Sequence, residues 1–84
     1  MAKRSVLMTR WSTALGADGA GQLLRDMRLA RSWTQQDLAD AIGYSRTSIT
    51  NMEVGRQVVT FDVICNAADV LGFRLTVQAE TIRP

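Results

Sequence analysis

Histidine is absent from this sequence of 84 residues, and cysteine occurs once, as Cys65. Without histidine, the chain lacks the imidazole that Cys/His zinc sites and His-based catalytic triads require. A single cysteine forms no disulfide within the chain, which favours a reducing compartment and predicts a cytoplasmic protein. The sequence also has no glycine loop of the kind that cradles phosphates. We therefore expect no metal, no cofactor and no enzymatic activity.

Long apolar runs are missing as well. No stretch approaches the roughly 20 apolar residues that a membrane span needs, so we expect a soluble protein with no membrane partner. The basic opening MAKRSVLMTRW is interrupted by Arg10 too early for a secretory signal. With 84 residues, the chain is near the lower size limit for a domain that buries an adequate core alone, which makes self-association a natural expectation.

Charge is unevenly distributed along the chain, although the net charge is only +2. Residues 1–31 hold six Lys and Arg against two Asp, whereas residues 32–71 hold two Arg against five Asp and Glu. This asymmetry predicts a polarised surface with one side suited to an anion.

The first 21 residues are predicted to form an N-terminal arm and hinge (1–21). Four apolar residues of the arm could form one helical stripe, and the segment GADGAG (16–21) is typical of a flexible hinge. The conformation of the arm is left open.

Helical periodicity begins after the arm. Apolar residues recur at three- and four-residue steps over 22–31, which predicts a first helix. Thr34 can cap a second helix over 35–42, and Asp37 can reach back to complete a weak capping box. Gly43 follows the last apolar residue and can adopt the left-handed conformation that ends a helix.

A third and a fourth helix follow. Ser45 is a suitable N-cap for a helix that runs to about Val54 and is polar on most of its surface. Such a helix is either solvated or inserted into a polar partner. Thr60 can cap a fourth helix over 61–71. The residues expected to face inward from it are Phe61, Ile64, Ala67, Ala68 and Leu71.

After Gly72 the apolar period changes from helical spacing to two. Phe73, Leu75 and Val77 alternate with polar residues, which predicts a strand. A lone strand needs a partner, either the same strand of a second subunit or the N-terminal arm, and we favour the first. Residues 73–84 are therefore predicted as a C-terminal dimerisation strand and tail.

Two short helices joined by a glycine turn describe a helix-turn-helix, whose second helix enters the major groove of DNA. Arg46 can bond a guanine through two N–H groups, and Asn51 can pair with an adenine. Thr47 or Thr50 can offer a hydroxyl or a methyl group to a base. At helix starts, or just beyond the third helix, the phosphate-binding candidates are Gln35, Ser45 and Arg56.

The stretch WTQQDLADAIGYSRTSITNMEVGR resembles the core of the lambda-repressor/Cro (Xre) helix-turn-helix family. The matching features are the Thr-Gln opening, the turn glycine, the Ser after the turn and the Glu two residues before glycine. The resemblance implies a mainly α, lambda-repressor-like DNA-binding domain of four to five helices over residues 22–72. It also implies a structural ion pair between Arg28 and Glu53. The base-reading residues that it implies are Arg46, Thr47, Thr50 and Asn51.

The tail LGFRLTV, directly after the fourth helix, is similar to HipB-type antitoxins. These are dimeric repressors whose C-terminal strands pair across a two-fold axis, and they bind a kinase-like toxin. The resemblance implies three partners: a double-stranded DNA operator, a second copy of the chain, and a HipA-like kinase toxin. We therefore expect a homodimeric repressor that acts on a palindromic operator and autoregulates its operon as an antitoxin. The alternative is a stand-alone phage or host Xre-type regulator with no toxin partner.

Overall fold

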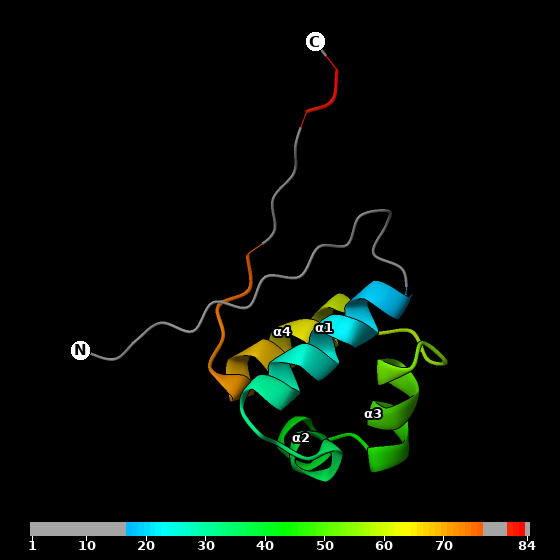
Figure 1. Cartoon of the computed structure of the whole chain (residues 1–84), viewed down its shortest axis with the longest axis vertical. Helices are drawn as coiled ribbons and strands as arrows, with labels where there is room; N and C mark the ends of the chain where they lie inside the picture. Colours follow the sequence, from blue (N-terminus) through cyan, green and yellow to red (C-terminus); the bar gives the residue numbers. More distant parts are fainter. Residues whose placement is uncertain (1–16, 77–80, 84) are drawn as a thin grey trace, which may run out of the picture.

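The computed structural model describes residues 17–76 and 81–83, and the described residues contain four helices (Figure 1). The helices are α1 (Ala17–Ala30), α2 (Gln35–Ile42), α3 (Arg46–Glu53) and α4 (Phe61–Leu71). Both α1 and α2 pack against α3 and α4, so one core lies between the four helices. The predicted mainly α architecture is confirmed. Within the described ranges, no helix combines the length and the apolar character that crossing a membrane requires.

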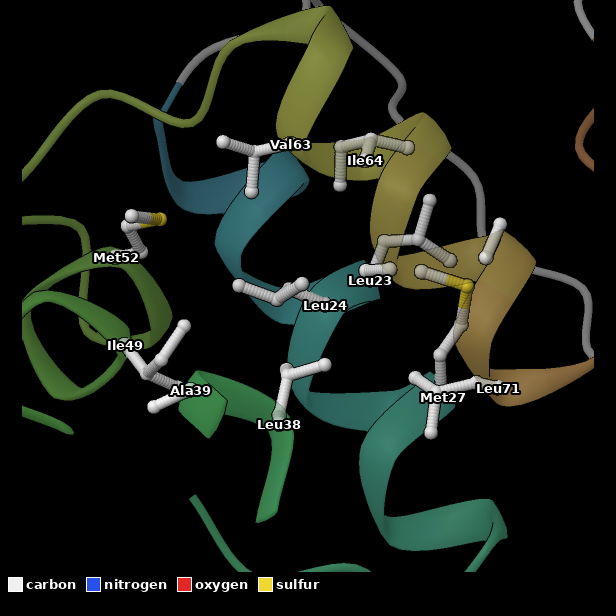
Figure 2. Close-up of a cluster of buried hydrophobic side chains, with 12 residues drawn as sticks. Leu23, Leu24, Met27, Leu38, Ala39, Ile49, Met52, Val63, Ile64 and Leu71 are labelled. Atoms are coloured by element: carbon white, nitrogen blue, oxygen red, sulfur yellow. The ribbon is translucent and has the colours of Figure 1, made fainter. Parts of the chain in front are cut away.

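All four helices contribute apolar side chains to the core (Figure 2). Leu24 from α1, Leu38 from α2 and Ile49 from α3 are completely buried. Each such side chain contributes about 1.5–3 kcal/mol of hydrophobic free energy. The buried cluster consists of Leu23, Leu24, Met27, Leu38, Ala39, Ile49, Met52, Val63, Ile64, Ala67, Ala68 and Leu71.

The first helix begins earlier than the sequence predicts. The flexible hinge expected over 16–21 is wrong for residues 17–21, which belong to α1. A Cβ at Gly21 would overlap the carbonyl oxygen of Met52. The absence of a side chain at Gly21 therefore lets α1 lie directly against the end of α3. The helix therefore crosses the predicted boundary between residues 21 and 22, and Gly21 serves helix packing and not a hinge.

The fourth helix has the predicted bounds, and the hydroxyl of Thr60 accepts a hydrogen bond from the backbone N–H of Val63 at 3.3 Å. The prediction that Phe61 faces inward is wrong, because this residue is 61% exposed. Val63 is buried instead. The two side chains differ because residues two apart on a helix point about 200° apart around its axis.

The strand predicted over residues 73–78 is not formed in the described part of the single chain. Residues 73–76 are neither helix nor strand, and residues 77 and 78 lie outside the described residues. Phe73 and Leu75 are half-buried and pack against the core. These two alternating apolar side chains therefore pack on this domain.

Arg31 fixes the point where the C-terminal segment leaves the domain, a role that the sequence analysis missed. Its Nε donates to the carbonyl oxygen of Leu71 at 2.8 Å, and its second terminal nitrogen donates to that of Gly72 at 3.3 Å. The guanidinium carbon lies 4.2 Å from the centroid of the Phe73 ring, within range of a cation–π interaction. Gly72 has a left-handed φ of 76°, which ends α4 and turns the chain.

Candidate nucleic-acid interface

The start of α2 is fixed by the capping box that the sequence predicts. The hydroxyl of Thr34 accepts a hydrogen bond from the backbone N–H of Asp37 at 3.0 Å. In return, the Asp37 carboxylate accepts one from the backbone N–H of Thr34 at 2.9 Å. The hydrogen bond from the Thr34 backbone N–H lowers the pKa of the Asp37 carboxyl below its usual range, and the hydrogen bond with the Thr34 side chain lowers it further. Two of the N–H groups that a helix start leaves without partners are thereby satisfied.

The turn between α2 and α3 occupies three residues. Gly43 adopts the left-handed conformation with a φ of 76°, as predicted, and the backbone N–H of Tyr44 donates to the carbonyl of Ala39 at 2.9 Å. Ser45 caps α3 at once, since its hydroxyl accepts from the backbone N–H of Ser48 at 3.0 Å. With a defined end on one helix and a defined start on the next, the angle between α2 and α3 is fixed by local hydrogen bonds.

The side of α3 that faces the core is buried, whereas the opposite side is polar and at least partly exposed. Ile49, Met52 and Glu53 are buried. The predicted base-reading residues occupy positions with the spacing i, i+1, i+4 and i+5, which share another side of the helix. Two are exposed, Arg46 and Thr47, and two are half-buried, Thr50 and Asn51.

The three predicted phosphate-binding residues lie around this outward side of α3. Ser45 is exposed at the N-terminus of α3, and Gln35 is the half-buried first residue of α2. Arg56 is exposed, and its backbone N–H donates to the carbonyl of Asn51 at 2.8 Å. That hydrogen bond holds Arg56 beside the C-terminal end of α3.

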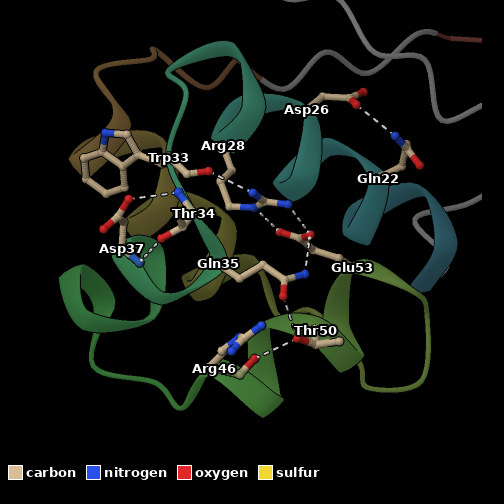
Figure 3. Close-up of polar contacts among 10 residues, drawn as sticks. All are labelled: Gln22, Asp26, Arg28, Trp33, Thr34, Gln35, Asp37, Arg46, Thr50 and Glu53. Carbon is tan, nitrogen blue, oxygen red and sulfur yellow. Dashed lines mark hydrogen bonds and ion pairs between the residues drawn. The ribbon is translucent and has the colours of Figure 1, made fainter.

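Arg28 and Glu53 form the ion pair that the resemblance implies (Figure 3). Arg28 donates from Nε to Glu53 Oε2 at 2.7 Å and from a terminal nitrogen to Oε1 at 2.8 Å. The other terminal nitrogen donates to the carbonyl of Trp33 at 2.8 Å. Hydrogen bonding to Glu53 raises the pKa of Arg28 against the opposing effect of burial. The two-pronged contact ties α1 to the end of α3.

Two further contacts extend the ion pair to the outward side of α3. Gln35 Nε2 donates to Glu53 Oε1 at 3.2 Å, and the hydroxyl of Thr50 lies 2.8 Å from Gln35 Oε1 (Figure 3). A continuous set of polar contacts therefore runs from Arg28 through Glu53 and Gln35 to Thr50. This set could not be predicted from the sequence, because no local spacing relates residue 35 to residue 50.

A family model described as a helix-turn-helix domain matches residues 13–80. The chain belongs to the Xre-like helix-turn-helix family. The family predicted from the Thr-Gln opening, the turn glycine and the following serine is thereby confirmed. Members of this helix-turn-helix family are DNA-binding regulators of transcription.

Among proteins similar to this helix-turn-helix chain is one from Thermococcus kodakarensis, named as an HTH-type transcriptional regulatory protein. It is 32% identical over 63 residues, which cover 75% of this chain and 20% of that protein. The chain thus spans about a fifth of the length of this relative.

Two solved structures show the same arrangement of helices. The restriction-modification controller protein C.AhdI from Aeromonas hydrophila superposes with a TM-score of 0.63 at 29% identity, covering 69% of this chain and 84% of that chain. A chain of the HipA–HipB–O2–O3 complex superposes with a TM-score of 0.62 at 20% identity, covering 84% of this chain and 100% of its own. The second similarity extends to the fold alone.

Proposed function

We propose that this helix-turn-helix protein is a sequence-specific transcriptional repressor that binds a palindromic operator as a homodimer. The observation that carries the proposal is the division of α3 into a buried side and a polar outward side. Ile49, Met52 and Glu53 hold the helix against the core, while residues able to bond base edges remain accessible. A rigid helix with this division suits insertion into the major groove.

Base recognition is assigned to four residues of α3 by the pattern of their donors and acceptors. Arg46 presents a guanidinium at the exposed first turn, where it can bond O6 and N7 of a guanine. Asn51 presents an amide that can bond N6 and N7 of an adenine. Thr47 and Thr50 contact neighbouring bases, through a hydroxyl or a methyl group.

Phosphate contacts are assigned to residues that flank the reading helix. Ser45 lies at the N-terminus of α3 and Gln35 at that of α2, and the N-terminus of a helix favours an anion. Gln35 Nε2 uses one hydrogen on Glu53 and retains the other for a phosphate oxygen. Arg56 adds a positive charge at the far end of α3. These contacts set the register of the protein on the duplex.

The dimer is proposed to form through the C-terminal segment. The alternating apolar residues Phe73, Leu75 and Val77 would pair as antiparallel strands across a two-fold axis. The contacts of Arg31 with Leu71 and with the Phe73 ring support this, since they fix where the segment leaves each domain. Such a dimer would present two α3 helices to successive major grooves, about 34 Å apart.

The binding proposal is tested by selecting bound duplexes from a random library and then measuring two matched variants. Arg46→Ala should cost about 1–3 kcal/mol on the selected site and relax the preference at one base pair. Arg56→Ala should weaken binding equally on all sequences and reduce the salt dependence by about one phosphate contact. A library that yields no preferred duplex would refute the proposed function.

The dimer proposal is tested by sedimentation of Leu75→Asp beside Thr76→Asp. A charge at the half-buried residue 75 should dissociate the dimer, whereas a charge at the exposed residue 76 should leave it intact. Melting curves separate dissociation from unfolding. If both variants sediment as dimers, the strand is not the interface.

The regulatory role proposed for the dimer is autoregulation as the antitoxin of a toxin–antitoxin pair. The support is the segment LGFRLTV, which begins at the last residue of α4 and is similar to HipB-type antitoxins. Co-purification with a kinase-like protein encoded beside the gene would support a HipA-like partner. A gene without such a neighbour would favour the second candidate, a stand-alone regulator, which the similarity to a restriction-modification controller supports.

A further inference from the structure

We propose that Thr50 recognises a thymine through its methyl group, because its hydroxyl proton is donated to an acceptor of the protein itself. The inference rests on the proposed function, since it requires α3 to enter the major groove. It resolves a choice that the residue type leaves open, because a threonine can offer a base either a hydroxyl or a methyl group.

The hydroxyl proton of Thr50 has two acceptors within the protein. Its Oγ1 lies 2.8 Å from Gln35 Oε1 and 3.0 Å from the backbone carbonyl of Arg46. A hydroxyl carries one proton, so either contact occupies it. Figure 3 shows both contacts, of which the one with Gln35 is partly buried and the one with Arg46 is exposed. Thr50 therefore has no proton to donate to O6 or N7 of a guanine, to O4 of a thymine or to N7 of an adenine.

The ion pair determines which end of the Gln35 amide faces Thr50. Glu53 accepts two hydrogen bonds from Arg28 and is an ionised acceptor, so it requires a donor from Gln35. Gln35 Nε2 supplies that donor at 3.2 Å. A rotated amide would instead place its oxygen against the carboxylate of Glu53, which is unfavourable. The oxygen of Gln35 is thereby directed at Thr50, where it needs the hydroxyl proton.

The methyl branch of Thr50 is what remains for an apolar base contact. Cβ carries the hydroxyl on one branch and the methyl group on the other, and the residue is half-buried, so part of it reaches the surface. In the major groove, the C5-methyl of thymine is the apolar feature that a side-chain methyl contacts. Thr50 is thus a specificity-determining residue for one thymine in each half-site.

The experiment uses the duplex selected by the wild-type protein, with each thymine replaced in turn by deoxyuridine, which lacks only the C5-methyl. For wild-type protein, each half-site should contain one thymine whose single replacement weakens binding about fourfold, the factor for one buried methyl group. Thr50→Val keeps a methyl group and should keep this thymine preference. Thr50→Ser keeps the hydroxyl and should bind both duplexes equally.

The thymine-to-uracil ratio compares two duplexes on the same folded protein, so a change in stability does not affect it. A ratio that survives in Thr50→Ser, or disappears in Thr50→Val, would overturn the inference. A wild-type protein indifferent to every replacement would also overturn it. A selection that yields no preferred duplex would refute the proposed function itself. That failure is seen before any deoxyuridine duplex is made, so it is distinguished from failure of the inference about Thr50.

Discussion

Replacing Glu53 by alanine is a direct test of how much the buried ion pair between Arg28 and Glu53 stabilises the fold. The side chain is 2% exposed and accepts three hydrogen bonds, two from Arg28 and one from Gln35. Its removal leaves the Arg28 guanidinium, whose side chain is 9% exposed, without a counter-charge. Removing one partner of a buried ion pair typically costs about 3–5 kcal/mol.

The lower end of this range applies here, because Arg28 keeps its hydrogen bond to the carbonyl of Trp33. We therefore expect Glu53→Ala to lower the free energy of unfolding by about 3 kcal/mol. A domain of this size is stable by about 5–15 kcal/mol in total. Each kcal/mol corresponds to about 4–8 °C in Tm, so the melting temperature should fall by at least about 10 °C.

Urea denaturation followed by far-ultraviolet circular dichroism measures this loss, at one fixed protein concentration because the stability of the proposed dimer would depend on concentration. Asp26→Ala is the matched control, since Asp26 accepts an exposed hydrogen bond from Gln22 at 2.8 Å. The control should lose less than about 0.5 kcal/mol. A second variant, Arg28→Met with Glu53→Leu, should be more stable than Glu53→Ala because no unpaired charge remains. If Glu53→Ala loses no more than the control, the ion pair does not stabilise the fold.

Three further substitutions should change the free energy of unfolding, or its dependence on pH, in a direction that follows from backbone conformation or from titration. Gly21→Ala should lower the free energy of unfolding by about 1–3 kcal/mol, because the new Cβ would overlap the Met52 carbonyl; an increase in denaturation midpoint would contradict the close helix contact. Ser32→Gly should raise the free energy of unfolding by about 1 kcal/mol, because Ser32 has a φ of 58°, which glycine adopts without strain. Ser32→Ala should not raise it, and equal effects of the two substitutions would show that backbone strain at residue 32 does not lower stability. The pKa of Asp37 is lowered from 3.8 by its bond to Thr34, so its stabilisation is present above that value and is lost as pH falls through the lower folded pKa. Asp37→Asn should accordingly lose less stability than wild type between about pH 5 and pH 2, and parallel acid denaturation curves would argue against this titration.

The parts of the fold that local chemistry determines could be predicted from the sequence. A cap involves residues at most three apart, so Thr34 and Ser45 could be recognised as helix starts without tertiary information. Gly43 and Gly72 end helices because the left-handed conformation favours glycine, and both adopt it. The residues of α3 proposed to read bases follow from the same helix register.

The errors and omissions concern contacts between distant segments. Gly21 is equally compatible with a hinge and with a close helix contact, and only the position of Met52 decides between them. Phe61 is a strong apolar signal at the start of α4, but the direction it faces depends on where the core lies. The stacking of Arg31 on Phe73 requires the crossing of α1 and α4. Contacts between residues that are far apart in the sequence depend on the arrangement of all four helices, so no local pattern predicts them.

The polar contacts that stabilise the fold also orient α3, the helix proposed to read the bases. Glu53 holds Arg28 and also fixes the amide of Gln35, which in turn fixes the hydroxyl of Thr50. A side chain that already has one orientation loses less rotational freedom when it meets a base, so this arrangement favours binding without adding a contact. It also couples stability to specificity. Glu53→Ala would release Gln35 and Thr50, so even the molecules that remain folded should discriminate less between thymine and uracil at the Thr50 position. Asp26→Ala, which leaves these contacts intact, should discriminate as well as wild type.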